Sequence, residues 1–172
     1  MPNKLSLEQS KAFLQNLASA LMPGYEFALW IEATANKNKF TAMLRHKAPN
    51  PILQKESLFL RIVAPGFYRE YIPINGLDSF LKKSNPALMF RPNQYMTLDE
   101  IAENIHCDLE TLHYTVIKAI KNRIHKALTY YDNDCHVFTI QATKRNNNTS
   151  EASTEILKTM EELYVWADLH AN

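Results

Sequence analysis

Residues 25–47 read YEFALWIEATANKNKFTAMLRHK, and this stretch decides the fold. Apolar and polar residues alternate on both sides of a polar break at 36–38. Phe27, Leu29 and Ile31 share one face in the first half, and Phe40 and Leu44 share one in the second. A period of two is typical of strands that bury one face. The stretch therefore predicts a β-hairpin, with residues 25–34 paired to residues 39–47.

Further strands and helices are predicted around this hairpin. Apolar stretches at 57–63, 67–72 and 135–143 predict three more strands. Apolar residues at helical spacing, with capping and breaking residues at the ends, predict helices at about 7–22, 77–83 and 151–170, the last after a mobile polar loop at 144–150. We expect an α+β protein, with an antiparallel sheet of about four to five strands and flanking helices.

The composition is that of an ordinary globular protein and excludes several classes. Among 172 residues, 46% are hydrophobic and the formal net charge is +1, although residues 1–94 are net basic and residues 95–172 net acidic. The chain has no apolar run long enough for a bilayer and no signal peptide at its start, so we expect a cytoplasmic protein without membrane partners. Its three glycines are too scattered for a phosphate-binding loop, and no nucleophile–base motif is present. We therefore expect neither an enzyme nor a cofactor.

Residues 97–124, TLDEIAENIHCDLETLHYTVIKAIKNRI, carry the clearest motif. Thr97 and Glu100 form a capping box for a short helix that ends near Ile105, and Asp108 caps a longer helix at about 109–131. The segment resembles a bacterial helix-turn-helix, of the type found in region four of sigma factors and in response-regulator output domains. His106 replaces the glycine usual in that turn, so we expect a looser turn. The matching positions are Ile101-Ala102, Ile105, Asp108, Thr111-Leu112, Val116 and Lys118-Ala119-Ile120.

The resemblance implies which residues would contact DNA. It places Thr111, His113 and Tyr114 near base edges, and Lys118 and Lys121 near phosphates. A helical wheel puts His125 on the same outer face as Tyr114 and the two lysines. Three alternatives remain open for this unit: an ordinary solvated helix surface, a protein-docking surface, and a winged variant completed by the strand at 135–143.

Two other groups of residues were weighed as sites. Basic residues of the predicted sheet are interleaved with aromatic ones, a pattern that can bind single-stranded nucleic acid by stacking. The aromatic residues are Tyr25, Trp30, Phe40, Phe59 and Phe67. His106, Cys107, His113, Cys135 and His136 lack the spacing of a zinc site, so we expect no metal, and the two cysteines are expected to be free thiols.

Taken together, the sequence predicts a small bacterial regulator. The leading hypothesis is a cytoplasmic DNA-binding or transcription-associated protein, with duplex DNA as partner. The alternative is an interaction protein: an adaptor, a secretion chaperone or a mobile-element inhibitor that binds a protein partner or forms a homodimer. Single-stranded nucleic-acid binding by the sheet is the third hypothesis. We expect one integrated domain, with a sensing or dimerising region at 1–94, the helix-turn-helix region at 95–134, and a returning strand, loop and helix at 135–172.

Overall fold

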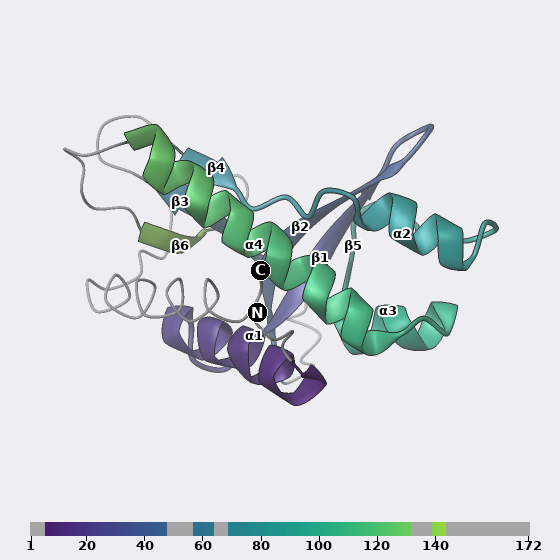
Figure 1. The fold of residues 1–172 in the computed structure, drawn as a ribbon, viewed down its shortest axis with the longest axis horizontal. Coiled ribbons are helices and arrows are strands. Elements are labelled where there is room, and N and C mark those ends of the chain that lie inside the picture. Colours follow the sequence, from purple (N-terminus) through teal and green to yellow (C-terminus); the bar gives the residue numbers. More distant parts are fainter. Residues whose placement is uncertain (1–5, 48–56, 64–68, 132–138, 144–172) are drawn as a thin grey trace, which may run out of the picture.

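The computed structural model describes residues 6–47, 57–63, 69–131 and 139–143, and for residues 124–131 of the long helix it describes the backbone alone. Four helices and six strands alternate along these residues (Figure 1). Their bounds are α1 (Leu7–Leu21), β1 (Tyr25–Ala33), β2 (Asn38–His46), β3 (Ser57–Val63), β4 (Arg69–Tyr71), α2 (Leu77–Ser84), β5 (Gln94–Met96), α3 (Leu98–Ile105), α4 (Leu109–Tyr131) and β6 (Thr139–Thr143).

The hairpin of β1 and β2 forms the middle of the sheet, as the alternation predicts. Its antiparallel register runs from Tyr25 opposite His46 to Ala33 opposite Asn38. The Thr34 hydroxyl donates a hydrogen bond to the Lys37 carbonyl and accepts one from the Lys37 N–H, which closes the turn. On the outer edge of β1, β5 adds a short antiparallel strand, with Trp30 opposite Tyr95.

Strand β3 has three antiparallel neighbours. Its first residues pair with β2, its last residues pair with β4, and its other edge pairs with β6 from Phe59 to Val63. The segment after β4 fills the gap that opens between β2 and β3: the Ala42 N–H donates to the Ile72 carbonyl at 2.9 Å, and the Ile72 N–H donates to the Leu60 carbonyl at 3.0 Å. Strands from both sides of α3 and α4 in the sequence thus belong to one sheet.

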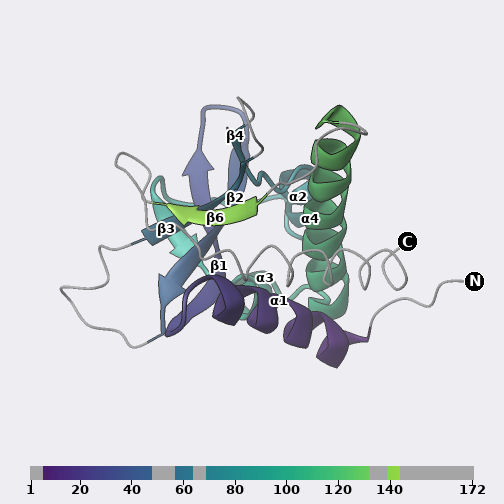
Figure 2. The same ribbon diagram turned by 90° about the vertical axis from the view of Figure 1, so that its left-hand side faces the viewer.

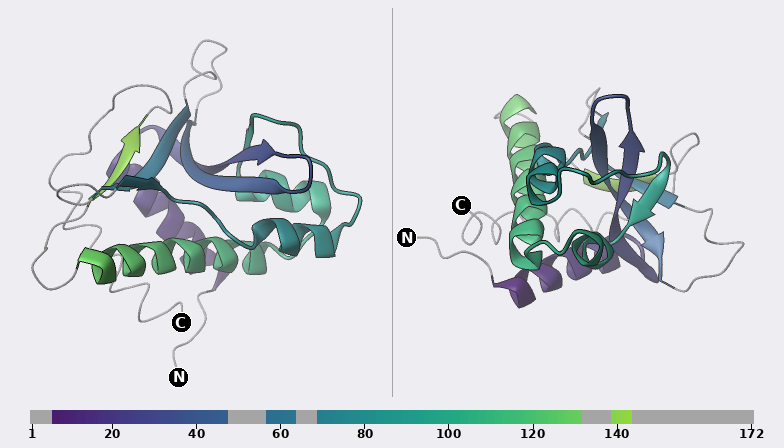
Figure 3. Two further views of the ribbon diagram at one scale, coloured as in Figure 1. Left: turned by 90° about the horizontal axis from the view of Figure 1, so that it is seen from above. Right: turned by 90° about the vertical axis from the view of Figure 1, so that its right-hand side faces the viewer.

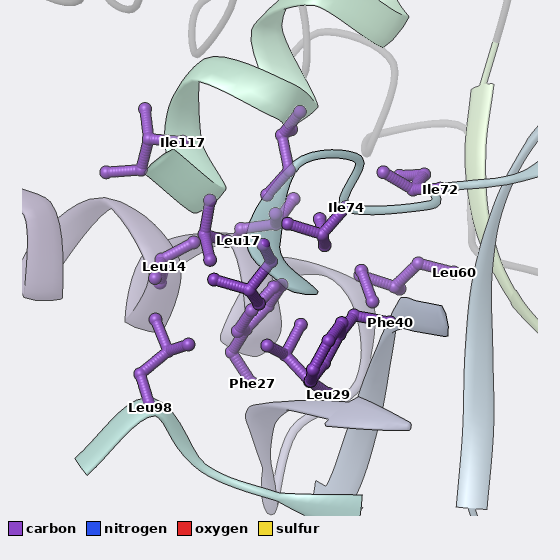
Figure 4. Close-up of a cluster of buried hydrophobic side chains, with 14 of the residues drawn as sticks. Leu14, Leu17, Phe27, Leu29, Phe40, Leu60, Ile72, Ile74, Leu98 and Ile117 are labelled. Carbon is purple, nitrogen blue, oxygen red and sulfur yellow. The ribbon is translucent and has the colours of Figure 1, made fainter. Parts of the chain in front are cut away.

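The helices lie on one side of this sheet (Figures 2 and 3). α1 begins with a capping box, in which Ser6 and Gln9 exchange backbone and side-chain hydrogen bonds. Leu14 and Leu17 of α1 and Ile117 of α4 pack over the apolar side of the strands, as the labelled side chains in Figure 4 illustrate. One buried cluster includes residues of α1, α2, α3, α4 and the strands β1, β2, β3 and β6.

The α+β class and the antiparallel sheet are confirmed. The sheet has one strand more than the sequence predicts, because β5 pairs with β1 although its three residues show no alternation. The predicted strand at 67–72 is shorter, since β4 spans Arg69–Tyr71. Residues 144–150 and the predicted helix at 151–170 lie outside the described residues. In the described part of the chain, no helix combines the length and the apolar character that a bilayer crossing requires.

Candidate functional site

The segment that resembles a helix-turn-helix folds into two helices joined by a tight turn (Figure 1). Thr97 caps α3, and its capping box with Glu100 has both hydrogen bonds, at 3.2 and 3.0 Å. His106 follows the last residue of α3 as its C-cap, and its φ of 52° and ψ of 38° lie in the left-handed region that favours glycine. Asp108 starts α4, because its carboxylate accepts hydrogen bonds from the Glu110 N–H and the Thr111 hydroxyl.

The apolar positions of this unit form the contact between the two helices and the core. Ile101, Ala102 and Ile105 of α3 are buried, and Leu112 and Val116 of α4 are buried in the same cluster. The expected looser turn is not found: His106 itself takes the left-handed conformation, and its N–H donates to the Ala102 carbonyl. The apolar positions of α3 and of the first half of α4 therefore pack against each other and the core. The residues that could contact a partner depend on which face of α4 is accessible.

Three predicted contact residues lie on the accessible side of α4. Lys118 is exposed, and Thr111 and Tyr114 are half-buried. No described residue engages the Lys118 ammonium in a hydrogen bond or an ion pair. The fourth, His125, belongs to the part of α4 for which only the backbone is described.

Two predicted contact residues, His113 and Lys121, are buried, although the sequence predicts them to be accessible on α4. His113 is only 5% exposed and Lys121 only 8% exposed, so both lie in the interior and not on an outer face. With Ile117 between them, they form a stripe at spacings of four residues. α4 is covered along this stripe as well as along that of Leu112 and Val116, because α1 packs beside it in addition to the sheet (Figure 2). The buried arc is therefore wider than the helical wheel predicts.

The environment of His113 keeps its imidazole neutral. Burial lowers the pKa of His113 to about 4, Asp99 opposes this shift, and Lys11 adds to it. Neither ring nitrogen has a hydrogen-bond partner among the described residues, and the same holds for the buried Ser10 hydroxyl of α1. An imidazole that is only 5% exposed is too deeply buried to reach a base edge.

A groove of about 440 Å³ follows the outer side of α4. One wall is the segment between β4 and α2, and the other is α4 itself. The groove carries two cationic side chains together with amide and hydroxyl groups, and no carboxylate lines it. Its lining residues are Pro73, Asn75, Tyr114, Thr115, Lys118, Ala119, Asn122 and Arg123.

The groove includes residues that the sequence reasoning missed. Arg123 is not among the contact residues that the sequence predicts, yet it is half-buried and lines the groove. Asn122 is not among the predicted contact residues either, although it is exposed on α4 and lines the groove. Asn75 carried no signal, because its approach to α4 depends on how the β4–α2 connection packs.

A second cavity, a cleft of about 480 Å³, lies between α1, the open end of the hairpin and α3. Arg45 organises one side of this cleft: its guanidinium donates to Glu26 at 2.8 and 3.1 Å and to Glu100 at 2.9 and 3.1 Å. It also lies over the Tyr95 ring, 5.4 Å from the centroid. Nearby, Lys11 Nζ is 3.3 Å from Asp99 Oδ1. The cleft therefore has a polar wall of fixed charges.

The described aromatic residues of the sheet do not form an accessible surface on which bases could stack, because two of them are buried. Phe40 lies in the main core, and Phe59 is buried on the opposite side, with edge-to-face contacts of 5.6 Å to both Trp30 and Tyr71. Neither phenylalanine is accessible for stacking on a base, which removes two of the five aromatics in the single-strand hypothesis. Phe67 lies outside the described residues.

The described residues show no cluster of three or more metal-ligating side chains. Cys107 is a half-buried free thiol, and burial raises its pKa. Cys135 and His136 lie outside the described residues. The described residues therefore do not form a metal centre.

Comparisons of the chain with family models, with curated proteins and with solved structures give no match, so its function rests on the geometry of the groove and the cleft.

Proposed function

We propose that the protein is a small cytoplasmic DNA-binding regulator that contacts the phosphate backbone of duplex DNA through the outer groove of α4. One observation carries this proposal: Lys118 and Arg123 line the groove together with hydrogen-bonding side chains, and no carboxylate is among the lining residues. Cationic side chains and neutral hydrogen-bond donors, with no carboxylate beside them, are groups that bind phosphate oxygens.

The charges near the turn favour contacts in the middle of α4 over contacts at its start. Asp108 and Glu110, in the turn and at the helix start, are exposed and would repel phosphates. The cationic groups follow later, at Lys118 and Arg123. The set of proposed DNA-contact residues therefore changes. Tyr114 and Lys118 remain in it and Asn122 is added. His113 and Lys121 are no longer proposed as contacts.

Fluorescence anisotropy with the full chain tests this proposal. The probe is a labelled duplex of about 20 base pairs, which covers two helical turns, titrated at about 50 and about 200 mM salt. We expect binding at the lower salt concentration and much weaker binding at the higher one. K118E should abolish binding or reduce it strongly, because it reverses an exposed charge in the groove.

The matched control is K83E, which makes the same change of charge at an exposed position of α2 outside the groove. K83E should bind as the wild type does. The absence of any duplex binding at about 50 mM salt, where phosphate contacts are strongest, would rule the proposal out. Equal losses in K83E and K118E would show that only the overall charge matters.

A protein-docking role is the second candidate, and one observation favours it. Met89, in the connection between α2 and β5, is 89% exposed beside the half-buried Leu88 and Phe90. A strongly exposed methionine next to partly exposed apolar side chains is a feature that an adaptor or a homodimer interface would use. M89E should abolish a stable complex seen by size-exclusion chromatography with light scattering and leave duplex binding unchanged.

A further inference from the structure

The cleft between α1, the hairpin and α3 has a distribution of charge that neither the fold nor nucleic-acid binding explains. Its lining includes three cationic and three anionic side chains. The Lys11–Asp99 pair neutralises itself. Arg45, however, serves both Glu26 and Glu100, which leaves one negative charge in excess on that side.

The compensating positive charge is separated from this acidic pair. Lys47 lines the cleft, is exposed, and has no side-chain hydrogen bond or ion pair to any described residue. Its backbone N–H donates to the Gly24 carbonyl at 3.0 Å, which continues the hairpin pairing by one step. Lys47 follows the last residue of β2, two residues beyond Arg45, and both residues line the cleft.

Apolar side chains line the cleft as well. Leu14 and Ala18 of α1, Phe27 of β1 and Leu98 of α3 line it. His113 lines it as well, from α4, and adds no charge at neutral pH. The volume of about 480 Å³ lies in the range of pockets that hold small molecules.

We propose that this cleft binds a small zwitterion with an apolar side chain, of which a free α-amino acid is the simplest form. The ligand carboxylate pairs with Lys47, its ammonium pairs with Glu26 and Glu100, and its side chain packs against Leu14 and Phe27. An α-amino acid carries a carboxylate, an ammonium and a side chain on one carbon, so it can offer one group to each kind of lining residue in a cleft of this size. The site stands independently of nucleic-acid binding.

Three probes that share one apolar body test the charge requirement. L-phenylalanine carries both charges, 3-phenylpropionate carries only the carboxylate, and phenethylamine carries only the ammonium. Each is titrated into the full-length protein, without nucleic acid, by saturation-transfer NMR or calorimetry. We expect L-phenylalanine to bind about tenfold more tightly than either of the other two, the difference made by one charge-assisted hydrogen bond.

Variants assign the two charges to residues. K47Q should bring the affinity for L-phenylalanine down to that for phenethylamine, and E26Q should bring it down to that for 3-phenylpropionate. The control K39Q changes an exposed lysine of β2 that does not line the cleft, and should leave all three affinities unchanged. Circular dichroism establishes that each variant is folded.

The proposal is overturned if none of the probes binds at about 10 mM, the weak end of measurable affinity, or if all three bind equally. An equal loss of affinity in K39Q and K47Q would overturn the assignment of the carboxylate to Lys47. Because no DNA is present, these outcomes are separate from the failure of duplex binding, which leaves the cleft proposal untouched.

Discussion

Acidification should destabilise this protein through His113 in particular. The imidazole is 5% exposed, its two nitrogens lack partners among the described residues, and burial lowers its pKa from 6.5 to about 4. In the unfolded chain the same group binds a proton near pH 6.5. Between these two pH values the unfolded state binds more protons, so the free energy of unfolding falls as the pH falls.

The size of the effect follows from the two pKa values. The difference between the pKa of His113 in the unfolded and the folded state corresponds to about 3 kcal/mol of unfolding free energy in total. About 2 kcal/mol of this is lost between pH 7 and pH 4.5. Above pH 6.5 the contribution is constant. Carboxylates also titrate in this range, so the effect of His113 has to be isolated by comparison with a variant.

The contribution of His113 to the free energy of unfolding is isolated by urea unfolding of the wild type and of H113L, each at pH 7 and at pH 4.5. Leucine has a similar volume and no titrating group, so H113L should match or exceed the wild-type stability at pH 7. Its loss of stability on acidification should be smaller by about 2 kcal/mol. The control H106N removes an exposed histidine and should behave as the wild type does. Equal losses in wild type and H113L would refute the buried, neutral state of His113.

Three further changes test the packing of the helices. K121E should destabilise the fold by about 3 kcal/mol, because it places a carboxylate at a buried position, whereas K118E at the exposed face should change the urea midpoint little. L17A, at a fully buried position of α1, should cost about 2–5 kcal/mol in the same measurement. H106G should raise the thermal midpoint, since glycine removes a left-handed strain of about 1 kcal/mol, and a lower midpoint would contradict the turn geometry.

Much of the fold was predictable because it depends on local patterns. The alternation in residues 25–47 specifies both strands and their faces, and the capping residues Ser6 and Thr97 start α1 and α3 where the sequence indicates. β5 was not predictable in this way. Its three residues contain no repeat, and it becomes a strand only because the edge of β1 offers hydrogen-bonding groups.

The candidate site was predictable only in part, because burial of a helix face depends on its neighbours. A helical wheel finds one apolar arc on α4 and correctly leaves Lys118 outside it. It cannot indicate that α1 covers the adjacent stripe of His113 and Lys121. The groove and the cleft combine segments that are distant in sequence, such as Asn75 with Tyr114, and no single-sequence pattern encodes such contacts.

The pairing of β3 with β6 has a consequence for how the protein is made. Leu60 lies opposite Ala142, so α2, α3 and α4 are all synthesised between the two partners. While the ribosome is still adding these helices, the outer edge of β3 exposes unpaired backbone groups of the kind that recruit other chains. The last described strand therefore acts as a closing step in biosynthesis: this edge of β3 gains its partner from the same chain only after residues 139–143 have been synthesised.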